Sequence, residues 1–267
     1  MHENFTSKHS VDRVLERISG LAEFRRRRNE ACFWLEGVRN FIAAIKAGWE
    51  FDTVVFSPVL LSNGMAQKLL RQLGHQGVKR VMVRPEQFRR VCTMERASGI
   101  GAICRQRWTG LNQLHARAGL CLLIVEELRS PGNLGTIIRT AHACGAGGII
   151  FVGPRCDPYH PAVVRASMGA LMHLPLARAD ERELRRWIAR EGIATVGLSP
   201  NAEALWTQAP AARPIAIVLG EERRGLSQTL DGLCAQTVRL PMMGEVDSVN
   251  VAVAAGVMLY ELVRRGI

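Results

Sequence analysis

From Leu120 onward the chain alternates short apolar runs with longer segments of helical periodicity, and this alternation constrains the fold more than any other feature. The apolar runs predict strands, and the periodic segments predict helices. Strands that alternate with helices imply a mostly parallel sheet covered on both faces. We therefore predict an α/β domain with strands at residues 120–125, 148–152, 194–198, 215–219 and 237–240, and helices at 133–144, 161–169, 181–190, 226–234 and 249–265.

The residues before this region predict a separate, smaller α/β domain. Val11, Val14, Leu15 and Ile18 recur at helical spacing and indicate an amphipathic helix near the start of the chain. Further helices are expected at 38–47, 65–73 and 86–91, and extended segments at 53–56, 81–83 and 100–104. The predicted division is an N-terminal domain at 1–106 (a helical extension at 1–30 and a folded part at 31–106), a linker at 107–118 and the larger domain at 119–267.

Positive charge is concentrated in the first part of the chain. Residues 1–118 carry 20 Lys and Arg against 10 Asp and Glu, whereas residues 119–267 carry 15 against 14. Such a surplus suits a polyanionic partner, because neutralised phosphates release their condensed counterions. Charge alone fits a solubilising bias equally well. The run Arg25–Arg28 is the strongest local signal, although runs of this kind commonly form a solvated helix face.

Several classes of protein are not indicated. The longest apolar runs are far shorter than the roughly 20 residues that span a bilayer, and the opening MHENFTSKHS lacks the apolar core of a signal peptide. We therefore expect a cytoplasmic protein that does not bind membranes. The seven cysteines form no CxxC pair, and the histidines show no HxxxH or CxxH spacing. Buried thiols are expected, without disulfides and without a metal.

Parallel sheets bind ligands beyond the carboxyl ends of their strands, so the segments after Val125, Leu219 and Leu240 are the candidate site. The first, SPGNLGTIIRTAHACGAGG, places Asn133 and Arg139 in an otherwise apolar helix. Its glycines do not have the GxGxxG spacing of a dinucleotide-binding loop or the spacing of a P-loop, which excludes both. Taken alone, the segment also fits an asparagine cap and a surface arginine.

The other two segments are also polar where they follow a strand. LGEERRGLS, residues 219–227, has adjacent glutamates and arginines and looks more like a site than a turn, the alternative being an acidic helix cap. LPMMGEVDSVNVAVAAGVMLYELVRR, residues 240–265, places Ser248 and Asn250 before an apolar helix with small residues. Small residues let another helix approach closely, in the core or at an interface.

In this order, NLGTIIRTA, LGEERRGLS and LPMMGEVDSVNVAVAAG resemble the three motifs of the SpoU/TrmH family, which are SPOUT-class RNA 2′-O-ribose methyltransferases. VVRASMGALMHLPLAR resembles the segment that links the family's motifs. The part from FWLEGVRNFIAAIKAG to SGIGAI is similar to the L30e-like substrate-binding domain that many members carry, although TMERASGI lacks the Pro-Gln often found there before Gly-Ile.

The resemblance implies an α/β trefoil-knot catalytic domain, a homodimer formed through it, and methyl transfer from S-adenosylmethionine to a ribose 2′-hydroxyl. It implies that Arg139 acts on this hydroxyl at a site shared with the partner subunit, and that four polar residues orient the ribose and Arg139: Asn133, Glu222, Ser248 and Asn250. The implied cofactor contacts are Leu198, Leu219, Gly220, Leu240, Met242 and Val249. The candidate RNA contacts are Arg25, Arg26, Arg27, Arg28 and Arg39.

Two questions stay open at this point. The separate N-terminal domain favours ribosomal RNA, most of all 23S rRNA, over transfer RNA, because members specialised for tRNA commonly use short basic extensions instead. A member that binds RNA but has lost catalysis is the other alternative, and the intact polar motif residues argue against it. For Arg139 we expect phosphate binding and charge stabilisation, with general-base action as the rival, because a guanidinium is hard to neutralise near pH 7.

Overall fold

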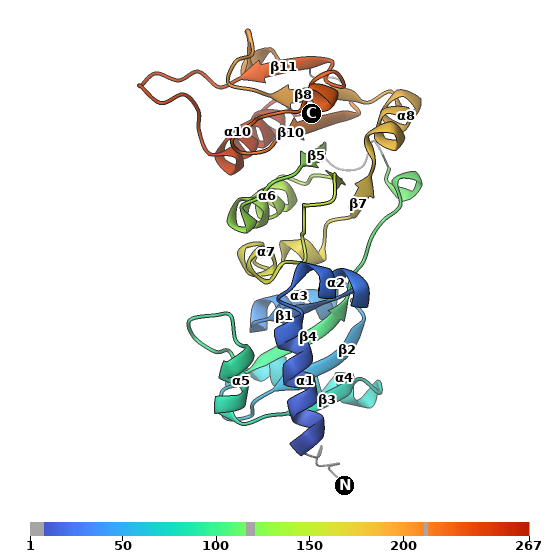
Figure 1. Ribbon diagram of the computed structural model, residues 1–267, viewed down its shortest axis with the longest axis vertical. Coiled ribbons are helices and arrows are strands. Elements are labelled where there is room, and N and C mark those ends of the chain that lie inside the picture. The colour runs from blue at the N-terminus through green and yellow to red at the C-terminus, as the bar shows by residue number, and fades with distance from the viewer. Residues whose placement is uncertain (1–7, 116–120, 211–212, 267) are drawn as a thin grey trace. The chain divides into compact units, whose positions relative to one another are not determined.

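The computed structural model describes residues 8–115, 121–210 and 213–266. Within these ranges the chain forms two compact units (Figure 1). The first contains the residues up to Gln106 together with Asp157–His173, and the second contains Arg107–Cys156 together with the residues from Leu174 onward.

The first unit is built on a four-stranded sheet of order β1-β4-β2-β3. Its strands are β1 (Cys32–Glu36), β2 (Phe51–Phe56), β3 (Lys79–Met82) and β4 (Ile100–Arg105), with β4 antiparallel to β1 and β2, and β3 parallel to β2. The apolar stripe of α1 (Lys8–Gly20) is buried with Trp34 and with Phe88 of α5 (Pro85–Val91) in one core cluster. The unit also holds α2 (Phe24–Glu30), α3 (Val38–Lys46) and α4 (Gly64–His75).

A segment distant in sequence completes this unit. It contains α7 (Pro161–Ala166) and the short 3-10 turn η2 (Ala170–Met172), and it packs against β1 and α3. The ring of Tyr159 lies 4.8 Å from that of Phe33, centroid to centroid, and the indole Nε1 of Trp49 donates to the carbonyl of Met172 at 2.9 Å. Every residue of β1 is therefore buried, since α1 covers one face and this segment the other.

The second unit has a seven-stranded parallel sheet of order β7-β6-β5-β10-β8-β11-β9. Its strands are β5 (Leu122–Glu126), β6 (Gly148–Val152), β7 (Leu176–Ala179), β8 (Ala194–Leu198), β9 (Ala204–Leu205), β10 (Ile215–Leu219) and β11 (Gln236–Arg239). The chain runs from β5 outward through β6 and β7, and the later strands add on the other side of β5. This reversal between β5 and β10 is the kind of switch point at which α/β sheets bind ligands.

Helices lie along this sheet. On one face, Leu184 and Trp187 of α8 (Glu181–Glu191) join the apolar side chains of β5, β6 and β10 in a core cluster that also includes Leu111 and Leu114. α6 (Pro131–Ala143) and α10 (Val251–Arg264) pack against each other, and α10 also contacts β10. The remaining short elements are η1 (Leu111–Gln113), η3 (Trp206–Gln208) and α9 (Gln228–Asp231).

The predicted α/β class with a mostly parallel sheet is confirmed, and most predicted elements are present. No strand was expected at β1, β7 or the two-residue β9, and α2 was covered only by the helical extension expected at 1–30. The helix expected at 161–169 ends at Ala166 because Met168 and Gly169 have positive φ angles, 54° and 94°. The structure also differs from the predicted domain division, since residues 157–173 pack with the first unit and Leu111 and Leu114 belong to the core of the second. Positions 1–7, 116–120, 211–212 and 267 of the predictions lie outside the described residues.

Candidate active site

The three loops expected to carry the chemistry follow strands β5, β10 and β11. In the sheet, β5 and β10 are neighbours, and β8 separates β10 from β11. Because all these strands are parallel, their carboxyl ends lie along one edge of the sheet. The loops at 127–130, 220–227 and 240–250 therefore emerge beside one another, together with the segment that follows Leu198.

Three of the predicted polar residues form a continuous hydrogen-bonded chain across these loops. The side-chain amide of Asn250 donates to Oδ1 of Asn133 at 2.9 Å, and the side-chain amide of Asn133 donates to Oε1 of Glu222 at 3.2 Å. Each asparagine is also fixed by its helix: Asn250 accepts from the backbone of Ala252 at the start of α10, and the backbone N–H of Asn133 donates to Ser130 at the start of α6. These hydrogen bonds join all three motif segments.

Glu222 is the organising group of this cluster. Its Oε1 accepts from the backbone N–H of Ser130 at 2.9 Å, and its Oε2 accepts from the backbone N–H of Arg129 at 3.1 Å. Partial burial raises the pKa of Glu222, but these backbone hydrogen bonds and that from Asn133 outweigh the burial, so the pKa lies below its ordinary value. Glu222 is therefore an ionised acceptor at neutral pH and is not suited to be a general acid.

The loop after β10 closes on itself in a tight turn. Glu221 and Gly225 exchange two backbone hydrogen bonds, of 3.0 Å and 2.9 Å. A Cβ atom placed on Gly220 would lie 2.2 Å from the backbone carbon and oxygen of Gly225, closer than any real contact. Position 220 thus admits only glycine if this turn is to form.

Beside this turn lies a cavity of about 610 Å³. All six predicted cofactor contacts line it: Leu198, Leu219, Gly220, Leu240, Met242 and Val249. Its walls combine these apolar side chains with the polar groups of Glu222, Ser248 and the turn. A cavity of this size that combines apolar side chains with many polar and charged groups can hold a nucleoside-sized ligand, which itself has an apolar ring and polar substituents.

The structure does not bring Arg139 into the polar cluster. It lies six positions after Asn133, which places the two about 9 Å apart along the axis of α6 and roughly 120° apart around it. Arg139 is exposed and forms no hydrogen bond or ion pair with the described residues. Ser248 is exposed too and lines the cavity, but it is not part of the hydrogen-bonded chain.

The arginine run at 25–28 is not one uniform surface. Arg25 and Arg28 are exposed, as is Arg39, whereas Arg26 pairs with Glu30 along the helix at 2.9 Å. Arg27 is only 1% exposed. It donates to Leu21 O at 2.6 Å and from Nε to Asp157 Oδ2 at 2.9 Å.

The prediction that Arg27 contacts RNA is therefore wrong, because its guanidinium is buried and holds the segment at 157–173 onto the first unit.

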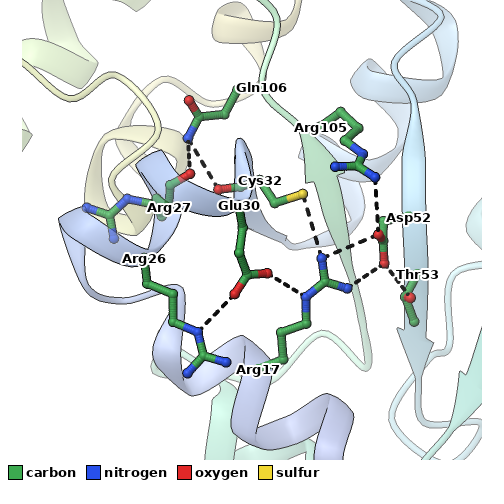
Figure 2. A network of polar contacts seen from close by, with 9 residues as sticks. All are labelled: Arg17, Arg26, Arg27, Glu30, Cys32, Asp52, Thr53, Arg105 and Gln106. Atoms are coloured by element: carbon green, nitrogen blue, oxygen red, sulfur yellow. Dashed lines mark hydrogen bonds and ion pairs between the residues drawn. The ribbon is translucent and has the colours of Figure 1, made fainter.

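A second arginine of this unit, absent from the predicted contacts, also holds the fold. Figure 2 shows Arg17 between two carboxylates, those of Glu30 at 2.6 Å and Asp52 at 2.7 Å. Burial raises the pKa of each carboxyl, but the hydrogen bonds from Arg17 outweigh it and keep both pKa values below their ordinary range. This network ties α1 and the end of α2 to β2.

The described residues form neither a metal site nor a membrane-spanning helix. Within residues 8–115, 121–210 and 213–266, no three His, Cys, Asp or Glu side chains gather as a metal site requires. None of the helices in the same ranges is long and apolar enough to cross a bilayer. All seven cysteines are free thiols, and burial raises the pKa of the Cys156 thiol to about 12, so it is unreactive.

Three charged residues near the polar cluster were not assigned from the sequence. Glu221 is 8% exposed and forms an ion pair with Arg129 at 3.2 Å. Arg129 and Arg223 line a second hollow together with Asn133 and Glu222. Their positions in the sequence could have indicated them, since Arg129 follows the buried strand β5 and the other two belong to the charged motif LGEERRGLS.

The chain is similar to known proteins over both units. Residues 121–260 match the family model described as the SpoU rRNA Methylase family, and residues 14–102 match the MRM3-like substrate binding domain. A 23S rRNA (uridine(2479)-2′-O)-methyltransferase from Streptomyces viridochromogenes is 30% identical over 98% of this chain and 92% of its own length.

Two solved structures match nearly the whole fold. The AdoMet-bound rRNA methyltransferase from Sinorhizobium meliloti has a TM-score of 0.89 at 29% identity, covering 98% of this chain and 97% of its own. The SpoU methyltransferase AviRb from Streptomyces viridochromogenes, in complex with the cofactor AdoMet, has a TM-score of 0.87 at 29% identity, covering 95% and 97%. With the family model matched over more than half of its length, this chain belongs to the SpoU/TrmH family of RNA methyltransferases.

Proposed function

We propose that this protein transfers a methyl group from S-adenosylmethionine to a ribose 2′-hydroxyl of ribosomal RNA. One observation carries the proposal: the chain Asn250–Asn133–Glu222 joins the three motif loops directly beside a cavity lined by all six residues expected to contact the cofactor. Two structural neighbours are described as bound to AdoMet. The relative that methylates a uridine 2′-oxygen of 23S rRNA supports both the ribose and the rRNA.

The cavity fits the cofactor by its surface. The apolar side chains of Leu198, Leu219 and Met242 suit an adenine ring, and the turn at Gly220 brings backbone against the same space. S-adenosylmethionine, when bound, supplies a methyl group on a positively charged sulfonium. The protein's task is then to hold the ribose oxygen in line with that methyl group, which is an effect of orientation.

The polar chain is suited to that task. Because Glu222 is fixed by two backbone N–H groups and orients Asn133, which in turn accepts from Asn250, the asparagine amides are held in one arrangement before RNA arrives. Preorganised groups of this kind need little rearrangement during the reaction. We assign these residues to positioning the ribose.

Arg139 is proposed to bind the phosphate of the target nucleotide and to stabilise charge as the 2′-oxygen loses its proton. Neutralising a guanidinium near pH 7 costs about 7 kcal/mol, which disfavours a full general-base role. Arg139→Lys tests this. Loss of the planar fork predicts a reduction of at least tenfold in kcat/KM, whereas near-normal turnover would contradict the need for bidentate contacts.

We also propose a homodimer formed through α10. Its exposed apolar side chains include Val253 at 54%, Tyr260 at 59% and Val263 at 44%, which recur at helical spacing. The exposed Arg139, displaced from the polar cluster of its own subunit, is consistent with a site completed by a partner. Tyr260→Asp is expected to give a monomer in sedimentation velocity, and a dimer of unchanged affinity would contradict this interface.

The substrate test uses labelled S-adenosylmethionine with 23S rRNA, 16S rRNA and tRNA, each transcribed without modifications. We expect label in 23S rRNA, at one nucleotide that primer extension can locate. Label confined to tRNA would replace ribosomal RNA by tRNA as the substrate, and no label in any RNA would contradict the enzymatic proposal. We also propose a cytoplasmic location, which agrees with ribosomal RNA as the substrate.

A further inference from the structure

Arg129 is a charged side chain next to the polar cluster that the proposed chemistry does not use. It follows β5 and precedes α6, so its backbone is part of the first motif loop. Its backbone N–H donates to Glu222 at 3.1 Å, which fixes the main chain at this point. Its guanidinium Nε lies 3.2 Å from Oε1 of Glu221, which holds the side chain over the second motif loop.

The guanidinium keeps its binding capacity. The side chain of Arg129 is 53% exposed, while that of Glu221 is 9% exposed. The contact with Glu221 is an ion pair, and none of the guanidinium N–H groups forms a hydrogen bond with a described residue. Arg129 therefore presents the planar donor fork that matches a phosphate, on a main chain that is already fixed.

The nearby carboxylates of Glu221 and Glu222 do not prevent an anion from binding to Arg129. Both oxygens of Glu222 accept hydrogen bonds from the motif loops, and Oε2 of Glu221 accepts from the backbone N–H of Arg224 at 3.0 Å. Their charges are thus directed inward to the protein's own donors. Arg223, which is exposed and forms no hydrogen bond or ion pair with the described residues, adds a second positive charge to the same hollow of about 490 Å³.

We propose that Arg129 binds a backbone phosphate of the RNA next to the nucleotide being methylated. This rests on the proposed function, because it places RNA over Asn133. Arg129 lines the hollow that contains Asn133, but it does not line the cavity of the six residues assigned to the cofactor. The carboxylate of S-adenosylmethionine is therefore the less favoured anion, and the experiment separates the two.

The test compares wild type with Arg129→Ala, Arg129→Lys and a matched control, Arg182→Ala on the exposed face of α8. Dissociation constants for 23S rRNA are measured between 50 and 300 mM KCl, and for S-adenosylmethionine by calorimetry. For Arg129→Ala we expect roughly tenfold weaker RNA binding and a salt slope, in log–log form, lower by about 1. Its affinity for S-adenosylmethionine should stay within twofold, and the control should match wild type.

Arg129→Lys keeps the charge and loses the fork, so the salt slope should persist while RNA binding weakens about threefold. This variant decides the matter if Arg129→Ala does not fold. Wild-type RNA binding in the folded Arg129 variants would overturn the phosphate contact, and loss of S-adenosylmethionine binding with normal RNA binding would assign Arg129 to the cofactor. Either result leaves the proposed function intact, whereas wild-type protein that methylates none of the RNAs would overturn the proposed function itself.

Discussion

Replacing Glu222 by glutamine removes one hydrogen-bond acceptor and the negative charge from the polar cluster at nearly constant shape. The carboxylate accepts the backbone N–H of Ser130 on Oε1 and that of Arg129 on Oε2. An amide has one acceptor oxygen, so in Glu222→Gln one of these N–H groups faces an NH₂ group and loses its partner. Shape and volume are nearly unchanged, so the differences are the lost hydrogen bond and the lost negative charge of the carboxylate.

The size of the effect follows from that loss. A hydrogen bond to a charged group contributes about 1.5–3 kcal/mol. If it serves to hold the loop in its reactive arrangement, kcat/KM for methyl transfer should fall about 10- to 150-fold, since about 1.4 kcal/mol corresponds to tenfold. Initial rates with labelled cofactor measure this, with Glu181→Gln on the exposed face of α8 as the control. Turnover of Glu222→Gln within twofold of wild type would refute the organising role.

Three further outcomes are expected. Arg27→Ala leaves the mostly buried carboxylate of Asp157 without its partner, so unfolding by denaturant should show a loss of about 3–5 kcal/mol, whereas the same change at an exposed arginine of the run should have little effect. Gly220→Ala forces a Cβ into the backbone of the turn and should abolish cofactor binding in calorimetry, while Gly244→Ala, whose Cβ meets nothing within 4 Å, should not. Burial raises the pKa of Glu30, but hydrogen bonds from two arginines lower it below 4.5 overall. The ionised carboxylate therefore stabilises the folded protein fully above about pH 4.5, and this stabilisation is lost as the pH falls through the folded-state pKa. Below pH 4.5 the melting temperature should fall more in wild type than in Glu30→Gln.

Periodicity and apolar runs predicted most of this fold because buried parallel strands read as unbroken apolar segments. The same reasoning missed β7, where Arg178 interrupts a four-residue strand near the sheet edge. It placed the four successive arginines of α2 on a solvated helix face, whereas Arg27 turns inward to Asp157. That partner lies 130 residues away, and no local pattern indicates such a pair.

The candidate site was also predicted only in part from the sequence. The motifs predicted the residue types and the loops of the site. They did not predict the hydrogen bonds from Asn250 to Asn133 and from Asn133 to Glu222, since these join residues 117 and 89 positions apart. The position of Arg139 outside this cluster follows from helix geometry once α6 is seen to be regular. The pairing of Arg129 with Glu221 depends on β5 and β10 being neighbours, which only the sheet order shows.

We propose that the methyl group goes to a ribose oxygen, and alkaline hydrolysis of the product distinguishes this from methylation of a base. RNA labelled by the protein with radioactive S-adenosylmethionine is digested in alkali, which cleaves only where the 2′-hydroxyl is free. Methylation of the ribose predicts that the label is recovered in an alkali-resistant dinucleotide, and that Asn133→Ala lowers its yield. Label recovered in mononucleotides would place the methyl group on a base and would contradict methylation of the ribose.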